Sequence, residues 1–186
     1  SLKSKIFLWL KSKIFNRLLV NTDFWMVQTD NVKDVFLNKF QKIEKNTVIL
    51  MPFYPPFTNK KDTGFREEKT FLYVSNGAPH KNHQRLIDGF IKFYKEYHSG
   101  KLYLTIGNNF PELQALIFQY QKKGFPIINV GFIERLELEK LYLKCEFLIF
   151  PSLSESFGLG LIEAMENGCK IIGADLPYTY SVCGAS

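Results

Sequence analysis

The sequence has no apolar stretch of the roughly 20 residues that a membrane-spanning helix needs. Its opening segment, residues 2–11, is interrupted by lysines and is followed by no small-residue cleavage site, so it resembles a signal peptide only superficially. Internal repeats and low-complexity segments are also absent. We therefore expect a globular protein and exclude transmembrane, secreted-precursor and repeat classes.

Cysteine is scarce, with Cys145, Cys169 and Cys183 in 186 residues. None of them forms a C-x-x-C pair, the spacing that would indicate a zinc or redox site. We expect reduced, mostly structural cysteines in a cytoplasmic protein.

Basic residues outnumber acidic ones, giving a net charge of +6 and a sequence pI near 9.1. Such a charge fits an anionic partner: a nucleotide diphosphate, an acidic lipid or a nucleic acid. Charge alone does not choose among the three. The 46% hydrophobic content is sufficient for a substantial core.

Prolines, turn formers and charges gather in residues 52–70, which predicts an interdomain linker over 53–70. The part before it, 1–52, contains a predicted helix over 2–20, a short strand at 24–28, a helix capped by Thr29 and a strand at 48–50. This part is too short for an independent doubly wound domain. The part after it, 71–186, has a more regular pattern.

Five short apolar runs follow the predicted linker, each of a length typical of a buried parallel strand: 71–75, 102–106, 127–130, 146–150 and 170–173. Helical periodicity lies between them, over 83–98, 111–123, 134–144 and 158–168. Alternating strands and helices predict an α/β fold with a doubly wound, Rossmann-like parallel sheet. Its ligand site is expected at the carboxyl ends of the strands.

The most informative segment is 150–164, where a strand ends in a polar turn and two glycines, Gly158 and Gly160, open a helix. Glycines let the backbone approach a ligand closely, and the free N–H groups of a helix start suit a phosphate. Glu155 in the turn is placed to accept hydrogen bonds from sugar hydroxyls. Glu163, eight positions later, is placed to bind the two hydroxyls of a ribose.

The Glu-x7-Glu spacing, together with the segment Gly77 to His83 after the first strand, resembles the signature of retaining glycosyltransferases of family four, the glycosyl transferases group 1. Further similar segments are 103–107, 129–133 and, upstream, 23–29. The resemblance implies the C-terminal half of a two-domain glycosyltransferase-B fold, truncated at both ends. Residues 1–52 are then a remnant of the N-terminal acceptor domain.

Carried across to this sequence, the resemblance implies a catalytic role for Lys81 at the donor diphosphate and for Glu155 at the sugar hydroxyls. The implied donor-binding residues are Gly77, Lys81, Phe132, Glu155, Ser156, Phe157, Gly158, Leu159 and Glu163. The implied reaction is retaining transfer of a hexosyl unit from a nucleotide sugar to a saccharide or lipid-linked acceptor. No cofactor or metal is expected, and an Asp-x-Asp metal motif is absent from the sequence.

Two departures from the family pattern affect the predicted donor site and activity. Ser75 and Asn76 stand in the stretch where many members place an arginine, which leaves Lys81 with less help at the diphosphate. Most of the acceptor domain is also missing, so we expect the isolated chain to be inactive. A non-catalytic nucleotide-binding or scaffold module with the same fold is the alternative.

Several features have a plainer alternative. The basic segment 2–20 either docks on an anionic bilayer at the inner face of the membrane or packs on its own domain with its lysines in water. His80 and His83 lack a third metal ligand at suitable spacing and are read as polar loop residues. Gly107 with its two asparagines is either part of a ligand cleft or a simple turn. Nucleic acid is not expected as a partner, because the most motif-like segment carries two carboxylates.

Overall fold

A computed structural model describes residues 2–51 and 64–184 and divides the chain into two compact units, Ser1–Phe53 and Tyr54–Ser186. The division falls at the start of the predicted linker, most of which lies outside the described residues.

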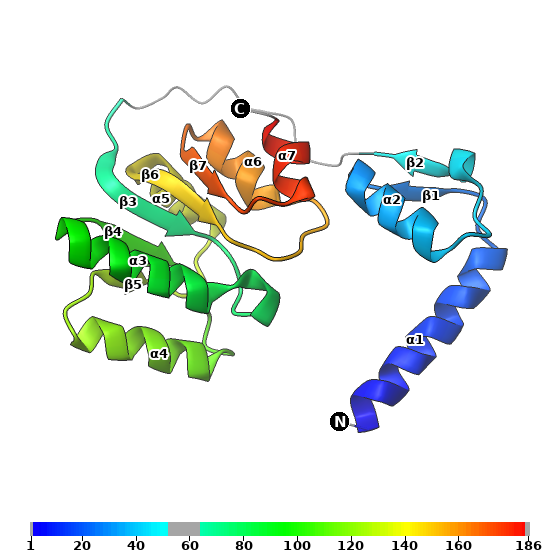
Figure 1. Cartoon of the computed structure of the whole chain (residues 1–186), viewed down its shortest axis with the longest axis horizontal. Coiled ribbons are helices and arrows are strands. Elements are labelled where there is room, and N and C mark those ends of the chain that lie inside the picture. Colours follow the sequence, from blue (N-terminus) through cyan, green and yellow to red (C-terminus); the bar gives the residue numbers. More distant parts are fainter. Residues whose placement is uncertain (1, 52–63, 185–186) are drawn as a thin grey trace. The chain divides into compact units, whose positions relative to one another are not determined.

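The first unit is a small βαβ arrangement preceded by a long helix (Figure 1). Its elements are α1 Leu2–Val20, β1 Trp25–Val27, α2 Asp30–Lys39, the 3₁₀ helix η1 Lys45–Thr47 and β2 Val48–Leu50. The two strands pair in parallel. The Thr29 side chain accepts a hydrogen bond of 3.3 Å from the Val32 amide, so the predicted cap of α2 is confirmed.

Helix α1 contacts the rest of the first unit through Phe15, whose ring lies 5.4 Å from that of Trp25 and 4.9 Å from that of Phe40. A stripe of apolar side chains on the same helix remains 46–62% exposed: Ile6, Leu10, Ile14 and Leu18. Among the described residues, no helix has the length and apolar character required to cross a membrane.

The second unit is built on a five-stranded, fully parallel sheet in the order β5-β4-β3-β6-β7. The strands are β3 Glu67–Tyr73, β4 Lys101–Leu104, β5 Ile127–Asn129, β6 Cys145–Phe150 and β7 Lys170–Gly173. The helices are η2 Pro79–Lys81, α3 His83–Tyr97, α4 Pro111–Lys122, α5 Arg135–Lys144, α6 Leu159–Glu166 and α7 Pro177–Cys183. All five predicted strands and the four predicted helices are present, and α7 is additional.

Strand β3 begins at Glu67, inside the segment predicted to be linker. Glu67 pairs with Cys145 of β6, and its carboxylate forms ion pairs with Lys101 and Lys144. The start of the strand is therefore held by ion pairs rather than by apolar side chains, and a search for apolar runs does not detect it.

The helices cover both faces of the sheet, with α3 and α4 on one side and α5 on the other (Figure 1). The central strands supply fully buried side chains, among them Leu72, Tyr73, Leu102, Leu104 and Leu148. Cys145 and Cys169 are buried free thiols, and burial raises the pKa of Cys145 to about 12. These two cysteines are structural, as predicted.

The strand order creates a switch point between β3 and β6. From β3 the chain proceeds outward through β4 to β5, and β6 then returns to the other side of β3. The loops that follow β3 and β6 consequently leave a crevice at the carboxyl ends of the strands, where open α/β sheets bind their ligands.

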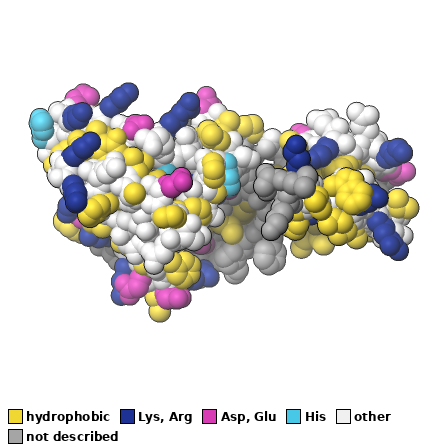
Figure 2. All heavy atoms as spheres, turned by 90° about the horizontal axis from the view of Figure 1, so that it is seen from below, with side chains coloured by type: hydrophobic (Ala, Val, Ile, Leu, Met, Phe, Trp, Pro, Cys, Tyr) yellow, Lys and Arg dark blue, Asp and Glu magenta, His cyan; other side chains and the backbone are white. Residues whose placement is uncertain are grey.

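Charged side chains on the visible face are dispersed. Figure 2 shows lysines and arginines interspersed with acidic and apolar side chains on each described unit, rather than gathered into one stripe. A single-sign stripe is the footprint typical of nucleic-acid binding, and this face of the described residues does not have one.

Candidate functional site

The loops after β3 and β6 meet at the switch point. Lys81, at the end of η2, places its Nζ atom 2.5 Å from Oε1 of Glu155, which lies in the turn between β6 and α6. The two side chains are only 16% and 13% exposed. This ion pair brings the two loops into contact.

Main-chain carbonyl groups tie the two loops together. The carbonyl of His80 accepts hydrogen bonds from the Leu153 amide at 2.8 Å and from the Ser152 hydroxyl at 3.3 Å. The Asn82 side-chain amide donates to the carbonyl of Pro151 at 3.1 Å. The position of Lys81 relative to Glu155 is thus set by the backbone as well as by the ion pair.

Two buried tyrosines donate hydrogen bonds to the two loops. Tyr73 donates its hydroxyl to the carbonyl of Lys81 at 2.9 Å, and Tyr178 donates to the carbonyl of Ser152 at 2.6 Å. Burial raises the pKa of both phenols, and the nearby Glu155 carboxylate raises them further. Both hydroxyls therefore stay protonated as donors. No role for Tyr178 could be predicted from local patterns, because its hydrogen bond joins residues 26 positions apart.

Helix α6 starts beside Glu155. Gly158 is its N-cap and has φ +91°, a left-handed conformation that glycine adopts without strain. A Cβ atom at Gly160 would lie 3.2 Å from the Phe150 ring, so the helix start also packs closely on β6. Phe157 and Gly158 are buried, whereas Ser156 and Leu159 are exposed. The first amides of such a helix suit an anion.

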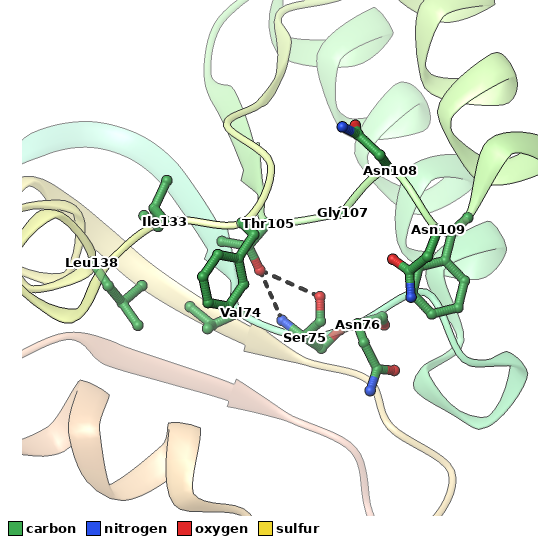
Figure 3. Close-up of a pocket in the computed structure, with 11 residues that line it drawn as sticks. Val74, Ser75, Asn76, Thr105, Gly107, Asn108, Asn109, Ile133 and Leu138 are labelled. Carbon is green, nitrogen blue, oxygen red and sulfur yellow. Dashed lines mark hydrogen bonds between the residues drawn. The ribbon is translucent and has the colours of Figure 1, made fainter.

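A cavity of about 540 Å³ opens at the carboxyl ends of β3, β4 and β5. All its lining residues are apolar or neutral: Val74, Ser75, Asn76, Thr105, Gly107, Asn108, Asn109, Phe110, Phe132, Ile133 and Leu138. Figure 3 shows Thr105 joined to Ser75 by two hydrogen bonds, one accepted from the Ser75 amide at 3.1 Å and one donated to its carbonyl at 3.3 Å. The cavity therefore suits an uncharged group with polar edges.

Phe132 lines this cavity and is 85% exposed. Gly107, Asn108 and Asn109 lie in the lining as well, which favours the cleft interpretation of that segment over a simple turn. Thr105 and Phe110 were not recognised from the sequence, although both lie close to the end of a predicted strand.

Asn129 joins the ends of two neighbouring strands. Its side chain accepts from the Ile106 amide at 2.8 Å and donates to the Ile106 carbonyl at 3.0 Å. Since these bonds fix the end of β5 to the end of β4, they also fix the two loops that line the cavity.

Gly77 lies beside Phe110 rather than beside the Lys81 ion pair. A Cβ atom at this position would come within 2.5 Å of the Phe110 ring. Gly77 and Phe110 line a small adjoining recess of about 270 Å³. A side chain is thus excluded here by the wall of the cleft.

Glu163 points into a separate small recess between α5 and α6. Its Oε2 atom accepts a hydrogen bond of 3.0 Å from the Tyr142 hydroxyl, and Arg135 and Asn167 line the same recess. Leu138 lines both this recess and the large cavity. The structure thus places Glu163 next to the cavity but outside its lining and away from the Lys81–Glu155 contact.

His83 is not the loop residue that the sequence suggested. It is the first residue of α3 and is buried, with its ring 4.9 Å from that of Tyr73 and its Nε2 atom 3.1 Å from the Ser75 hydroxyl. Asn82 adopts a left-handed conformation, φ 62°, and directly precedes α3, so His83 opens the helix predicted over 83–98. Burial, and then the charge of Lys81, lower the pKa of His83 to about 4.

His80 remains exposed. Within the residues that the structure describes, no three His, Cys, Asp or Glu side chains come together in a metal-binding group.

Comparison with known proteins connects this geometry to one family. A family model described as "Glycosyl transferases group 1" matches residues 57–183. The O-antigen chain mannosyltransferase RfbU of Salmonella typhimurium is 33% identical over 132 residues, which are 67% of this chain and 35% of that protein. The alpha-monoglucosyldiacylglycerol synthase of Acholeplasma laidlawii is 28% identical over 179 residues, covering 88% of this chain and 44% of the synthase.

A solved structure with the same fold is that of the pneumococcal O-GlcNAc transferase GtfA in complex with UDP and GlcNAc. It superimposes with a TM-score of 0.74 at 25% identity, over 88% of this chain and 33% of that one. The chain spans about a third of the length of two curated relatives that it matches, 35% of one and 31% of the other.

Proposed function

Because the chain belongs to the glycosyl transferases group 1, we propose that it is the donor-binding part of a retaining glycosyltransferase with the glycosyltransferase-B fold. The proposed reaction moves a hexosyl unit from a nucleotide diphosphate sugar to a saccharide or lipid-linked acceptor. The observation that supports it best is the approach of Lys81 and Glu155 beside the N-terminus of α6, at the switch point of the sheet.

The chemistry follows from charge. Departure of a nucleoside diphosphate builds negative charge, which Lys81 and the first amides of α6 are placed to stabilise. The backbone around Ser156 to Leu159 meets the phosphate and the sugar. Glu155 accepts hydrogen bonds from sugar hydroxyls. No step in this scheme assigns charge stabilisation to a metal, so we expect transfer to continue in the presence of EDTA.

The neutral cavity is the proposed place of the nucleoside. Phe132 offers an exposed aromatic face to a nucleobase, and Gly77 keeps the wall beside Phe110 free of a side chain. Glu163 is proposed to bind the ribose from the recess that adjoins the cavity through Leu138. This role requires the carboxylate to turn away from Tyr142 when the donor binds.

The acceptor is proposed by class only. Relatives named as an O-antigen mannosyltransferase and a diacylglycerol glucoside synthase indicate saccharide and lipid acceptors. For a lipid-linked acceptor, α1 is proposed to rest on an anionic membrane surface, since its exposed apolar stripe is accompanied by Lys11, Lys13 and Arg17. Co-sedimentation of the protein with vesicles containing phosphatidylglycerol tests this membrane contact. Protein that stays in the supernatant contradicts it.

The test of donor binding is calorimetric titration with UDP, GDP and their sugar derivatives. We expect one base to bind, and Lys81→Ala to weaken that binding about a hundredfold, because a charged contact to the diphosphate is lost. Glu163→Ala is expected to weaken binding about tenfold. Lys140→Ala removes an exposed lysine whose ion pair with Glu137 is local to α5, and serves as the control.

Unchanged binding in both Lys81→Ala and Glu163→Ala would refute the site assignment. Failure of the complete gene product to bind any nucleotide would instead favour the non-catalytic scaffold alternative.

A further inference from the structure

The Lys81–Glu155 ion pair has a consequence for which ligand the site prefers. In the absence of ligand, the cation proposed to hold a diphosphate is already neutralised by the carboxylate proposed to hold a sugar. The atoms are 2.5 Å apart and both side chains are largely shielded from water, so the pair is not a screened surface contact.

A diphosphate that reaches Lys81 must displace or crowd this carboxylate. An ammonium group has three donor hydrogens, but a phosphate oxygen and a carboxylate oxygen brought to the same nitrogen repel each other. Glu155 therefore has to give up its contact, and a shielded carboxylate without a replacement donor is costly.

The neighbouring phenols do not provide that replacement. The charge of Glu155 contributes to the raised pKa of both Tyr73 and Tyr178, so these phenols lie within its electrostatic reach. Each hydroxyl has one hydrogen, and these are already donated to the carbonyls of Lys81 and Ser152.

A nucleotide sugar and a bare nucleoside diphosphate differ at this point. The sugar brings hydroxyl groups that donate to Glu155 as Lys81 turns to the diphosphate, so one partner is exchanged for another. The bare diphosphate brings no such hydroxyl. Its binding breaks the ion pair without compensation at Glu155.

We propose that Glu155 is a specificity-determining residue that makes the site prefer the nucleotide sugar over the nucleoside diphosphate left after transfer. When the sugar has gone, Glu155 competes with the diphosphate for Lys81 and promotes its release. This inference rests on the proposed function, because it assumes that the ligand is a nucleotide sugar.

The test compares Glu155→Gln with the unsubstituted complete protein by calorimetric titration with UDP and UDP-glucose, UDP and UDP-N-acetylglucosamine, and GDP and GDP-mannose. An amide cannot form the ion pair, so we expect the bare diphosphate to bind about tenfold more tightly to the variant. The nucleotide sugar loses its contact to the carboxylate and gains the freed lysine, so its affinity is expected to change less. The preference for the sugar form therefore falls about tenfold.

Two matched variants separate this effect from a general loss of negative charge. Glu137→Gln removes an exposed carboxylate paired with Lys140 and is expected to leave both affinities unchanged. In a Lys81→Gln background, Glu155→Gln is expected to have no further effect on diphosphate binding, because the partner for which they compete is absent. Thermal melting of each variant confirms that it is folded, and Glu155→Asp, which keeps the charge, replaces Glu155→Gln if the latter does not fold.

Equal or weaker diphosphate binding by folded Glu155→Gln would overturn the proposal while leaving the proposed function intact. The Glu155→Asp variant keeps the charge but withdraws the carboxylate from Lys81. If its preference between the two ligands is unchanged, the proposal is also overturned. If the unsubstituted protein binds neither diphosphates nor nucleotide sugars, the proposed function fails and this inference fails with it.

Discussion

The site has a charged half, around Lys81 and Glu155, and a neutral half, around the cavity, and the two halves differ in charge and in the exposure of their side chains. On the β3–β6 side, Lys81 and Glu155 are locked by an ion pair and by hydrogen bonds to main-chain carbonyls. On the β4–β5 side, a neutral cavity of about 540 Å³ is lined by exposed groups such as Phe132 and Asn108. Charge is fixed before a ligand arrives, whereas the uncharged half is open.

This difference has a physical reason. A misplaced charge costs far more than a misplaced apolar contact, so the groups proposed to face a diphosphate gain most from being held in advance. A flat, uncharged group gains from surface contact, which tolerates small adjustments. Four substitutions test this difference.

The largest effect is expected at the wall of the neutral half. Gly77→Ala would place a methyl group within 2.5 Å of the Phe110 ring, forcing that side chain to move. We expect the free energy of unfolding to fall by about 2 kcal/mol, measured by urea denaturation. Gly89→Ala, in the interior of α3 with no atom within 4 Å of the added carbon, is the control and should stabilise by about 0.5 kcal/mol. If Gly89→Ala also lost stability, the loss in Gly77→Ala could not be attributed to crowding against Phe110.

A smaller effect is expected beneath the charged half. Tyr178→Phe removes the buried hydroxyl that donates to the carbonyl of Ser152 at 2.6 Å, and should lower the free energy of unfolding by about 1.5 kcal/mol. Tyr180→Phe removes an exposed hydroxyl bonded to Asp175 and should have little effect. Equal losses of stability in both variants would argue against a role for Tyr178 in holding the loop at Ser152.

The pH dependence of stability is expected to come in part from His83. Its pKa is lowered to about 4 in the folded protein, below its ordinary value of 6.5, so the unfolded chain binds more protons in this range. The contribution of neutral His83 is complete above pH 6.5 and is lost as the pH falls toward 4. Between pH 6.5 and 5 we expect a loss of about 1.5 kcal/mol that His83→Gln abolishes.

Exposed His98 provides the control for this series, because His98→Gln should leave the pH profile of unfolding unchanged. Lys81, the Tyr73 ring and the Ser75 hydroxyl lie beside the His83 ring, so the profile is also to be measured in Lys81→Gln. A profile that is identical in native protein and His83→Gln would disprove the assignment.

The smallest effect is expected at the open end of the cavity. Phe132→Ala should weaken nucleotide binding about threefold without changing the melting temperature, since the ring is 85% exposed and packs on little. Leu136→Ala, at a 74% exposed position on α5, should change neither quantity. A fall in melting temperature for Phe132→Ala would show that the neutral half is more tightly built than its exposure suggests.

Local patterns in the sequence predicted most of the fold. Buried parallel strands leave continuous apolar runs, so all five strands of the second unit were found, and the polar turn before Gly158 was identified as part of the candidate site. The start of β3 was missed because ion pairs of Glu67 replace apolar burial there.

The remaining features depend on contacts between distant segments. Tyr178 acts on a carbonyl 26 residues away, and His83 is buried by Tyr73 and Ser75 rather than by its own sequence neighbours. Glu163 was placed at the correct helix, but the direction of its carboxylate toward Tyr142 depends on how α5 packs beside α6. No spacing rule within one segment contains that information.

Most of the bonds that join the loops of the charged half end on main-chain oxygens, those of His80, Lys81, Pro151 and Ser152. Every amino acid carries such an oxygen, whatever its side chain. Mutation at position 80 or 81 can therefore change the chemistry presented to a ligand while the framework stays in place. In evolutionary terms, descendants of this cleft can acquire new donors by exchanging a few side chains, without rebuilding the loops that carry them.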